Sequence, residues 1–261
     1  EVLNLLNKGR FILAEKKILK LIDIDPNNYV YQNLLAIIYA NQKKFKDCIT
    51  ILKNIIKKNP AFIDAYINLG KVYNDLNKLK QAEKYFKKAA TIQPKQILAL
   101  FNLANILDKQ KKLTAASKIY SKLIEKDPNN LEFLNNFSSN QINLGNLNKA
   151  EELLNKIIIS DSKNVNALIN FGKVQKERNN LNEAIEYFKK AINFQSNSAI
   201  AYYNLGTVYQ NMNDFISAVK NLKKAIKINP VYAEAHYNLG CVLDELGQKK
   251  EAAIHYEKAI Q

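Results

Sequence analysis

Apolar residues recur along the chain at intervals of three and four positions, which is the spacing of one face of an α-helix. Residues 63–96 contain two such series, namely Tyr66, Leu69, Gly70 and Tyr73, followed by Ala82, Phe86 and Ala89. A short polar segment at 77–78 lies between them. The pattern therefore predicts two helices joined by a turn in this stretch.

The same pattern returns every 34 residues without an insertion. Tyr-Tyr-Asn-Leu-Gly at 202–206 is followed 34 positions later by His-Tyr-Asn-Leu-Gly at 236–240, and Tyr-Ile-Asn-Leu-Gly at 66–70 precedes the first of these by four such intervals. Helix pairs repeated at a fixed interval stack on their neighbours and bury a continuous core. We therefore expect one array, with a half repeat at 1–28, repeats at 29–62, 63–96, 97–130, 131–164, 165–198 and 199–232, and a truncated repeat at 233–261.

Proline closes most of these units. It follows the second predicted helix at Pro26, Pro60, Pro94, Pro128 and Pro230. Proline ends a helix because it lacks the backbone N–H and clashes with the preceding turn. Two units have Ser162 and Ser196 at this point instead, and there we expect less sharply defined helix starts.

A small residue stands at the twentieth position of every unit: Ala14, Cys48, Ala82, Ala116, Ala150, Ala184, Ala218 and Ala252. With the aromatic, Leu-Gly and proline positions, this column resembles the tetratricopeptide repeat, a helix-turn-helix unit of 34 residues. The resemblance covers the whole chain. It implies an all-α fold, a right-handed α-solenoid of tandem helix-turn-helix repeats, and a role in protein–protein interaction.

A few positions depart from the repeat pattern. Gln141 and Gln175 stand where tyrosine is usual, and Ser138 stands where glycine is usual, so we expect looser packing in the middle repeats. Cys48 takes the alanine position and is expected to be a small buried residue rather than a reactive thiol.

The sequence lacks the residue groups that carry catalysis or hold a metal or cofactor. It has two histidines and two cysteines in 261 residues, and no glycine-rich phosphate loop. His236 takes the position of Tyr66 and Tyr202 in sister units, which indicates packing. We therefore expect neither enzymatic activity nor a bound cofactor. Cysteines this sparse favour a reducing compartment, the cytoplasm.

The net charge of the chain suggests a second candidate function. The chain has 39 lysines and arginines against 24 acidic residues, a formal net charge of +15. The excess lies in lysine runs on the predicted second helices and turns, such as 43–44, 57–58, 87–88, 111–112 and 223–224. This indicates a solvated convex face, because the first-helix columns of the concave groove are mildly acidic. Nucleic-acid binding by the basic convex face remains an alternative.

Asparagine fills the sixth position of six successive units: Asn68, Asn102, Asn136, Asn170, Asn204 and Asn238. Asparagine costs roughly half a kcal/mol relative to alanine inside a helix, so its repetition calls for a reason. The array is similar to that of O-linked N-acetylglucosamine transferase, and this resemblance implies an asparagine ladder that holds an extended peptide backbone. The amide suits that role because it is both donor and acceptor. A competing interpretation is that each asparagine only bonds to the adjacent repeat.

The neighbouring columns complete the predicted peptide-binding site. Besides the six asparagines, this site comprises Lys71, Phe101, Asn105, Lys173, Tyr203 and Tyr237. Some tetratricopeptide domains clamp a C-terminal carboxylate with lysines on this face. The fifth column lacks lysine here, and no arginine lies in the groove, so we do not expect such a clamp.

Two further hypotheses concern the surroundings of the array. One is that it is the N-terminal targeting array of a larger enzyme of the glycosyltransferase or sulfotransferase type. The other is self-association through uncapped ends, where Leu243, Tyr256 and Ile260 would lack a following repeat. A membrane span is not expected, since no apolar run approaches the roughly 20 residues needed.

Overall fold

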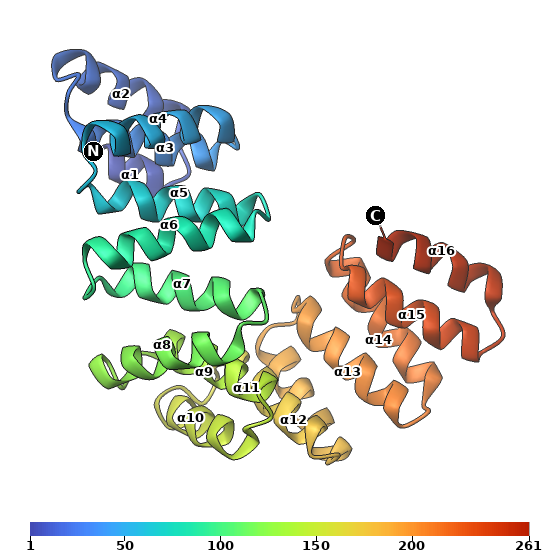
Figure 1. The fold of residues 1–261 in the computed structure, drawn as a ribbon. Coiled ribbons are helices and arrows are strands. Elements are labelled where there is room, and N and C mark those ends of the chain that lie inside the picture. The colour runs from blue at the N-terminus through green and yellow to red at the C-terminus, as the bar shows by residue number, and fades with distance from the viewer. Residues whose placement is uncertain (261) are drawn as a thin grey trace. The chain divides into compact units, whose positions relative to one another are not determined.

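The computed structural model describes residues 1–260, and within them the chain forms sixteen helices and no strand (Figure 1). The first helices of the successive pairs are α1 (Val2–Asn7), α3 (Tyr29–Asn41), α5 (Ile63–Asp75), α7 (Ile97–Lys109), α9 (Leu131–Asn143), α11 (Val165–Glu177), α13 (Ala199–Asn211) and α15 (Ala233–Glu245). The second helices are α2 (Phe11–Ile24), α4 (Phe45–Lys58), α6 (Leu79–Ile92), α8 (Leu113–Lys126), α10 (Leu147–Ser160), α12 (Leu181–Phe194), α14 (Phe215–Ile228) and α16 (Lys249–Ile260).

The predicted fold class is confirmed, since every repeat is a pair of helices and α3, α5, α7, α9, α11, α13 and α15 each begin at the first residue of a 34-residue unit. The chain divides into two compact parts, an N-terminal unit (Glu1–Lys126) and a C-terminal unit (Asp127–Gln261). Within each unit, neighbouring first helices contact one another, as α5 does with α3 and α7, and α13 with α11 and α15. That a single array runs through both units stays a prediction.

The turn inside each pair contains one residue with positive φ. These residues, also 34 positions apart, are Gly9, Lys43, Asn77, Lys111, Gly145, Asn179, Asn213 and Gly247. At Lys111 (φ 61°), the N–H of Lys112 donates to Leu107 O at 2.9 Å. This bond closes the end of α7 in the manner of a Schellman turn. The left-handed conformation is disfavoured for residues with a Cβ, so the two lysines at this position are strained.

Replacing Lys111 with glycine is expected to stabilise the N-terminal unit by about 0.5–1 kcal/mol, because relief of backbone strain exceeds the added entropy of the unfolded chain. Lys111 is exposed, so no packing is lost. Urea-induced unfolding followed by circular dichroism measures the change. The reciprocal control is Gly145→Ala, at φ 78°, which should lose stability; equal midpoints for the three chains would contradict the explanation by backbone strain.

The small residues of the twentieth column are buried in every pair. Seven are alanines at 0–2% exposure, and Cys48 is 1% exposed. Burial raises the pKa of the Cys48 thiol to about 12, which keeps it protonated and unreactive. The expectation that Cys48 fills the core agrees with this environment.

The two helices of a pair also approach each other closely at the eighth position of the unit. A Cβ on Gly172 would lie 2.5 Å from Phe188 Cε1, and one on Gly70 would lie 2.6 Å from Phe86 Cε1. In the repeat of Ser138 the equivalent residue of the second helix is Leu154, and both residues are fully buried. The looser packing expected around Ser138 stays a prediction.

The two glutamines in the tyrosine column are also buried, at 4% for Gln141 and 6% for Gln175. Gln141 Oε1 accepts from Asn146 Nδ2 at 2.9 Å, and Gln175 Oε1 accepts from Asn180 Nδ2 at 2.9 Å. Each glutamine thus holds the turn of its own pair, so the middle repeats replace aromatic packing by a hydrogen bond.

The helix starts after the two serine positions differ from the expectation. Asn164 Oδ1 accepts from Ala167 N at 3.1 Å, and Ser198 Oγ accepts from Ala201 N at 3.3 Å. These side chains cap α11 and α13, whereas α5, preceded by Pro60, starts without a side-chain cap. The predicted weakness was wrong, because an N-cap side chain defines a helix start as well as proline does.

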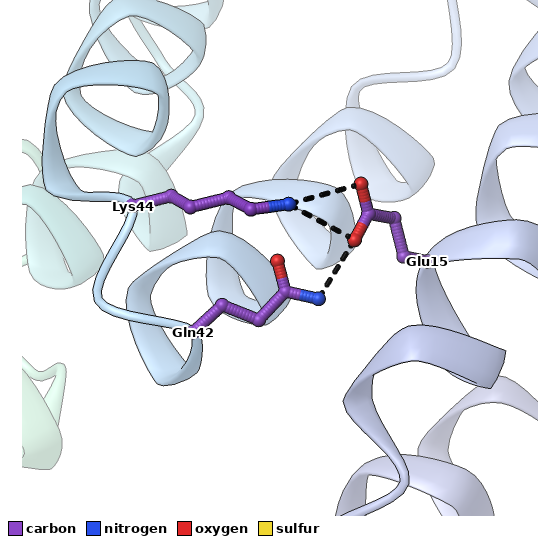
Figure 2. A network of polar contacts seen from close by, with 3 residues as sticks. All are labelled: Glu15, Gln42 and Lys44. Atoms are coloured by element: carbon purple, nitrogen blue, oxygen red, sulfur yellow. Dashed lines mark hydrogen bonds and ion pairs between the residues drawn. The ribbon is translucent and has the colours of Figure 1, made fainter.

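Ion pairs fasten some second helices to the next repeat. Glu15 on α2 accepts from Gln42 Nε2 at 2.7 Å and from Lys44 Nζ at 3.3 Å (Figure 2). The hydrogen bond from Gln42 is the main cause that lowers the pKa of Glu15. Sixty-eight residues later, Glu83 pairs with Lys112 Nζ at 2.7 Å. After the same interval Glu151 pairs with Arg178 Nη1 at 2.8 Å.

Candidate binding face

The six ladder asparagines all lie on first helices, on a face that we call the asparagine face. Asn68 Nδ2 donates to Asn33 Oδ1 at 2.9 Å, and Asn238 Nδ2 donates to the Tyr203 hydroxyl at 3.3 Å. Asn170 Nδ2 lies 3.4 Å from Asn135 O. These three amides therefore connect adjacent repeats.

Two other ladder amides bond within their own helix. Asn102 Nδ2 donates to Leu98 O at 2.7 Å, and Asn204 Nδ2 donates to Ile200 O at 2.8 Å. Each acceptor is the carbonyl four residues earlier. Such a bond fixes nothing between repeats and adds little to the helix.

The residue 35 positions earlier differs among these five asparagines. Asn68 and Asn238 donate to the polar side chains of Asn33 and Tyr203, whereas Asn170 lies beside the backbone carbonyl of Asn135. Asn102 and Asn204 are preceded at this distance by Ile67 and Ile169, whose side chains offer no acceptor. The competing interpretation, bonding to the adjacent repeat, therefore describes three of these five asparagines and fails for two.

The amide oxygens on this face have no donor among the described residues at Asn68, Asn102, Asn170, Asn204 and Asn238. Asn170 and Asn204 are 8% and 4% exposed, and the other ladder asparagines, Asn136 included, are half-buried. Within each of the two units, the asparagine face thus presents carbonyl acceptors on adjacent first helices rather than projecting side chains.

Three further predicted residues lie in the N-terminal unit. Lys71 is exposed on α5. Asn105 Oδ1 accepts from the Tyr120 hydroxyl at 2.6 Å, and the buried Phe101 ring meets the Tyr120 ring edge-on with centroids 6.4 Å apart. Phe101 and Asn105 thus both contact α8 of their own pair, and their contribution to binding stays a prediction.

Lys173 lies at the middle of the asparagine face of α11. It is half-buried, and no carboxylate among the described residues pairs with it. Burial lowers the pKa of Lys173, and the neighbouring Lys176 lowers it further. Lys176 itself lies 3.9 Å from Glu177. A desolvated ammonium group without a counter-ion favours an anionic or carbonyl acceptor on a bound chain.

A cavity of about 760 Å³ brings three of the predicted residues together in the C-terminal unit. It is lined by Tyr203, Ala233, Glu234, Tyr237, Asn238, Tyr256, Ala259 and Ile260. We call it the tyrosine pocket. The sequence interpretation placed Tyr203, Tyr237 and Asn238 in one site, but missed Tyr256 as a pocket residue because it belongs to a second helix.

The rings of the tyrosine pocket are fixed but accessible. Tyr203 meets Tyr232 with ring centroids 5.0 Å apart, and Tyr237 meets Tyr256 at 5.9 Å. Burial raises the pKa of Tyr203, so its hydroxyl stays neutral. Tyr237 is 56% exposed. Large apolar or aromatic side chains exposed in a concave site are typical of binding surfaces.

His236 has the packing role that its column suggests. Its Nε2 lies 3.0 Å from Pro230 O, where the Tyr66 hydroxyl in a sister repeat donates to Pro60 O at 3.1 Å. Its Nδ1 lies 2.9 Å from His255 Nδ1. Histidine therefore replaces tyrosine as the donor to the same backbone carbonyl.

No helix in the described part of the chain has the length and apolar character needed to cross a bilayer. Among residues 1–260, no three histidine, cysteine or acidic side chains gather in a manner suited to a metal ion.

Repeat families match several parts of the chain. One described as TPR repeat matches residues 172–213. Others described as tetratricopeptide repeat match residues 63–96, 98–130 and 197–261. Together these matches cover more than half of the chain. No curated protein sequence matches it.

Solved structures of similar fold include a tetratricopeptide repeat protein from Parabacteroides merdae ATCC 43184, with a TM-score of 0.78 and 23% identity over 88% of this chain and 91% of that one. A chain of the APC/C hetero-tetramer Cut9–Hcn1 has a TM-score of 0.72 and 19% identity over 99% of this chain and 51% of that one. Yeast Tom70 has a TM-score of 0.68 and 18% identity over 95% and 54%. The chain thus spans about half the length of the last two, and these likenesses establish the fold.

Proposed function

The chain belongs to the tetratricopeptide repeat family, and on that premise we propose that it is an interaction module whose asparagine face binds an extended segment of a partner protein. The observation that carries this proposal is the row of amide oxygens without donors on adjacent first helices. The N–H groups of a protein backbone are the donors that such oxygens accept.

The spacing of the ladder suits an extended chain. Packed helices lie about 8–10 Å apart, so successive ladder asparagines are expected roughly 10 Å apart. An extended chain advances about 3.3 Å per residue, so every third residue would meet an amide. Asn136 and Asn238 are separated by three such intervals in the C-terminal unit, which corresponds to a segment of about nine residues.

Recognition of the peptide backbone would allow many partner sequences to bind, and the side chains beside the ladder would make some sequences bind more tightly than others. Asn204 and Asn238 each donate one amide N–H inside the protein, and their oxygens are the acceptors that the ladder offers to the bound chain. Tyr203, Tyr237 and Lys173 lie on the same first-helix face and would contact the side chains of that segment. The proposed module therefore tolerates many sequences and favours some.

The test uses a peptide selected from a random 16-residue library on the immobilised chain. Asn204→Ala is expected to weaken its binding about 3- to 10-fold, as loss of one hydrogen bond implies. Stability should change little, because only a bond to the helix's own Ile200 carbonyl is lost. Fluorescence anisotropy measures the dissociation constant, and circular dichroism measures stability.

The chain offers a matched control in Asn221. Its Nδ2 donates to Ser217 O at 2.8 Å, the same bond to the fourth preceding carbonyl, but it lies on the second helix α14. Asn221→Ala should leave binding unchanged. Equal losses at both positions, or no loss at Asn204, would reject the asparagine face as the binding surface.

A further inference from the structure

Nearly all of the net charge of the chain lies in the N-terminal unit. Residues 1–126 contain 24 lysines and arginines against 10 acidic residues, whereas residues 127–261 contain 15 against 14. A composition that favoured lysine everywhere would raise the charge of both units alike. The difference therefore calls for an explanation that is specific to the N-terminal unit.

The positive charge is concentrated on second helices. Helices α2, α4, α6 and α8 together carry 14 lysines and the five acidic residues Glu15, Asp23, Asp47, Glu83 and Glu125. Among the described residues, Lys17 and Lys87 alone of these lysines pair with a carboxylate. The second helices of the N-terminal unit therefore keep a large excess of ammonium groups that the chain itself does not neutralise.

One repeat position distinguishes the second helices of the two units. In the N-terminal unit, three of the four second helices have an exposed lysine at the twenty-second position of the repeat, each four residues before another exposed lysine: Lys16, Lys84 and Lys118. In the C-terminal unit this position holds Glu152, Glu186, Lys220 and Ile254. Glu152 pairs with Lys156, four residues later, at 3.4 Å.

The lysine pairs of the N-terminal unit carry a cost. Like charges four residues apart on a helix repel each other, whereas a glutamate four residues before a lysine attracts it. Natural proteins depart from such local rules chiefly at functional sites. We call the exposed lysines of these three pairs the lysine face: Lys16, Lys20, Lys84, Lys88, Lys118 and Lys122.

A pocket lies among the lysines of α6. Its volume is about 380 Å³, and it is lined by Tyr66 of α5 and by Lys84, Tyr85, Lys87, Lys88 and Thr91 of α6. We call it the lysine pocket. Helix α6 contacts both α5 and α7, so the pocket lies inside the N-terminal unit rather than at its end.

The lysine pocket combines aromatic rings with ammonium groups. The Tyr85 ring stacks on the Tyr73 ring with centroids 5.4 Å apart, and Lys84 Nζ lies 6.0 Å from the centre of the Tyr85 ring. Burial raises the pKa of Tyr85, and the positive charge of Lys53 on α4 opposes that rise. A lysine of the preceding second helix therefore also lies near this ring.

The chemistry of the lysine pocket favours an acidic protein segment over a nucleic acid. Tyrosine rings and the methylene groups of lysines offer apolar surface beside the charge, which an apolar side chain can cover. A nucleic-acid backbone offers phosphates without apolar groups, and unpaired bases bind by stacking on accessible aromatic rings. No aromatic side chain of α2, α4, α6 or α8 is exposed.

We propose that the lysine face binds an acidic segment of a partner protein, with an apolar side chain of that segment in the lysine pocket. Carboxylates of the segment pair with lysines at the repeat position where the C-terminal unit has its own glutamates. The lysine face lies on second helices and the asparagine face on first helices, so the two surfaces bind different segments.

The test measures binding of labelled probes to the full chain by fluorescence anisotropy. Two peptides of about 16 residues, spanning roughly 50 Å when extended, have glutamate and serine in alternation; one of them carries a central leucine in place of a serine. A DNA duplex of similar length is the third probe. At physiological salt the leucine peptide should bind most tightly, about 5-fold more tightly than the serine peptide. Its affinity should fall as salt is added.

Variants at the twenty-second repeat position locate the effect. Lys84→Glu should weaken binding of the leucine peptide about 5-fold, because it removes one attraction and adds one repulsion. The new carboxylate would precede Lys88 as Glu152 precedes Lys156, so urea-induced unfolding should show no loss of stability. Lys84→Arg should retain binding. Lys220→Glu makes the same change on α14, in the C-terminal unit, and should leave binding nearly unchanged.

Four results would overturn the proposal: no binding of either peptide, tighter binding of the duplex, equal binding of the two peptides, or equal losses in Lys84→Glu and Lys220→Glu. The second would assign the lysine face to nucleic acid, and the last would show that only net charge matters. Asn204→Ala should not change binding of these probes, so failure here and failure of the proposed function remain distinguishable.

Discussion

Replacing Gly172 with alanine is expected to destabilise the C-terminal unit by about 2 kcal/mol. The added Cβ would lie 2.5 Å from Phe188 Cε1, and both residues are buried. Overpacking of a filled core costs about 1–3 kcal/mol, which exceeds the gain of up to about 1 kcal/mol in helix propensity. Urea-induced unfolding, followed by circular dichroism, measures the difference.

The chain itself suggests the compensating change. Ala36 occurs with Leu52, and Ser138 occurs with Leu154, at the positions equivalent to Gly172 and Phe188. Adding Phe188→Leu to Gly172→Ala should therefore give a smaller loss than the sum of the two single losses. Additive losses would show that the two positions do not interact.

Replacing Glu83 with glutamine is expected to destabilise the N-terminal unit by about 2 kcal/mol at pH 7. Glu83 is 8% exposed and accepts from Lys87 at 2.6 Å and Lys112 at 2.7 Å. Burial alone would raise its pKa, but the hydrogen bonds from the two lysines lower it to about 2. The loss follows from this shift, reduced because both lysines are half-exposed to solvent.

The same pKa fixes the dependence on pH. The carboxyl has a folded pKa of about 2 against an ordinary value of 4.5, so its stabilisation is complete above pH 4.5 and is lost as the pH falls towards 2. Unfolding curves between pH 2 and pH 7 should converge for the native chain and Glu83→Gln at the acid end.

Glu152 provides the control for the ion pair. It pairs with Lys149 at 2.7 Å on the surface, with about half of its side chain exposed. Exposed pairs contribute about 0–1 kcal/mol, so Glu152→Gln should change stability much less than Glu83→Gln. Equal effects of the two substitutions would mean that burial of Glu83 is unimportant.

The regularity of the repeat explains how much of the fold is predictable. Apolar residues at intervals of three and four positions predict the helices. Because the 34-residue interval is uninterrupted, a helix boundary assigned in one unit predicts the corresponding boundary in every other unit. The turns were predictable only as polar segments, because Lys43 and Lys111 give no signal of a left-handed conformation. Both lysines occupy the same position of the 34-residue repeat as Gly9, Gly145 and Gly247, and this equivalence was the signal in the sequence.

The sequence predicted which repeat position carries the ladder asparagines but not the hydrogen-bond partners of their amides. The sequence places an asparagine at the sixth position, yet the partners of these amides differ: Asn68 donates to a side chain of the adjacent repeat, and Asn204 donates to a carbonyl of its own helix. That difference becomes visible only when adjacent first helices are seen in contact. The tyrosine pocket required Tyr256 from a second helix, which a search along one helix face does not reach.

Photo-crosslinking tests the central claim most directly, because it reports where a bound segment lies. The library-selected peptide carries benzophenone-alanine at each position in turn, and mass spectrometry identifies the residues that are crosslinked. The account predicts crosslinks to the first helices α9, α11, α13 and α15, in chain order as the label moves along the peptide. Crosslinks concentrated on the lysine-rich second helices, such as residues 223–224 of α14, would contradict it.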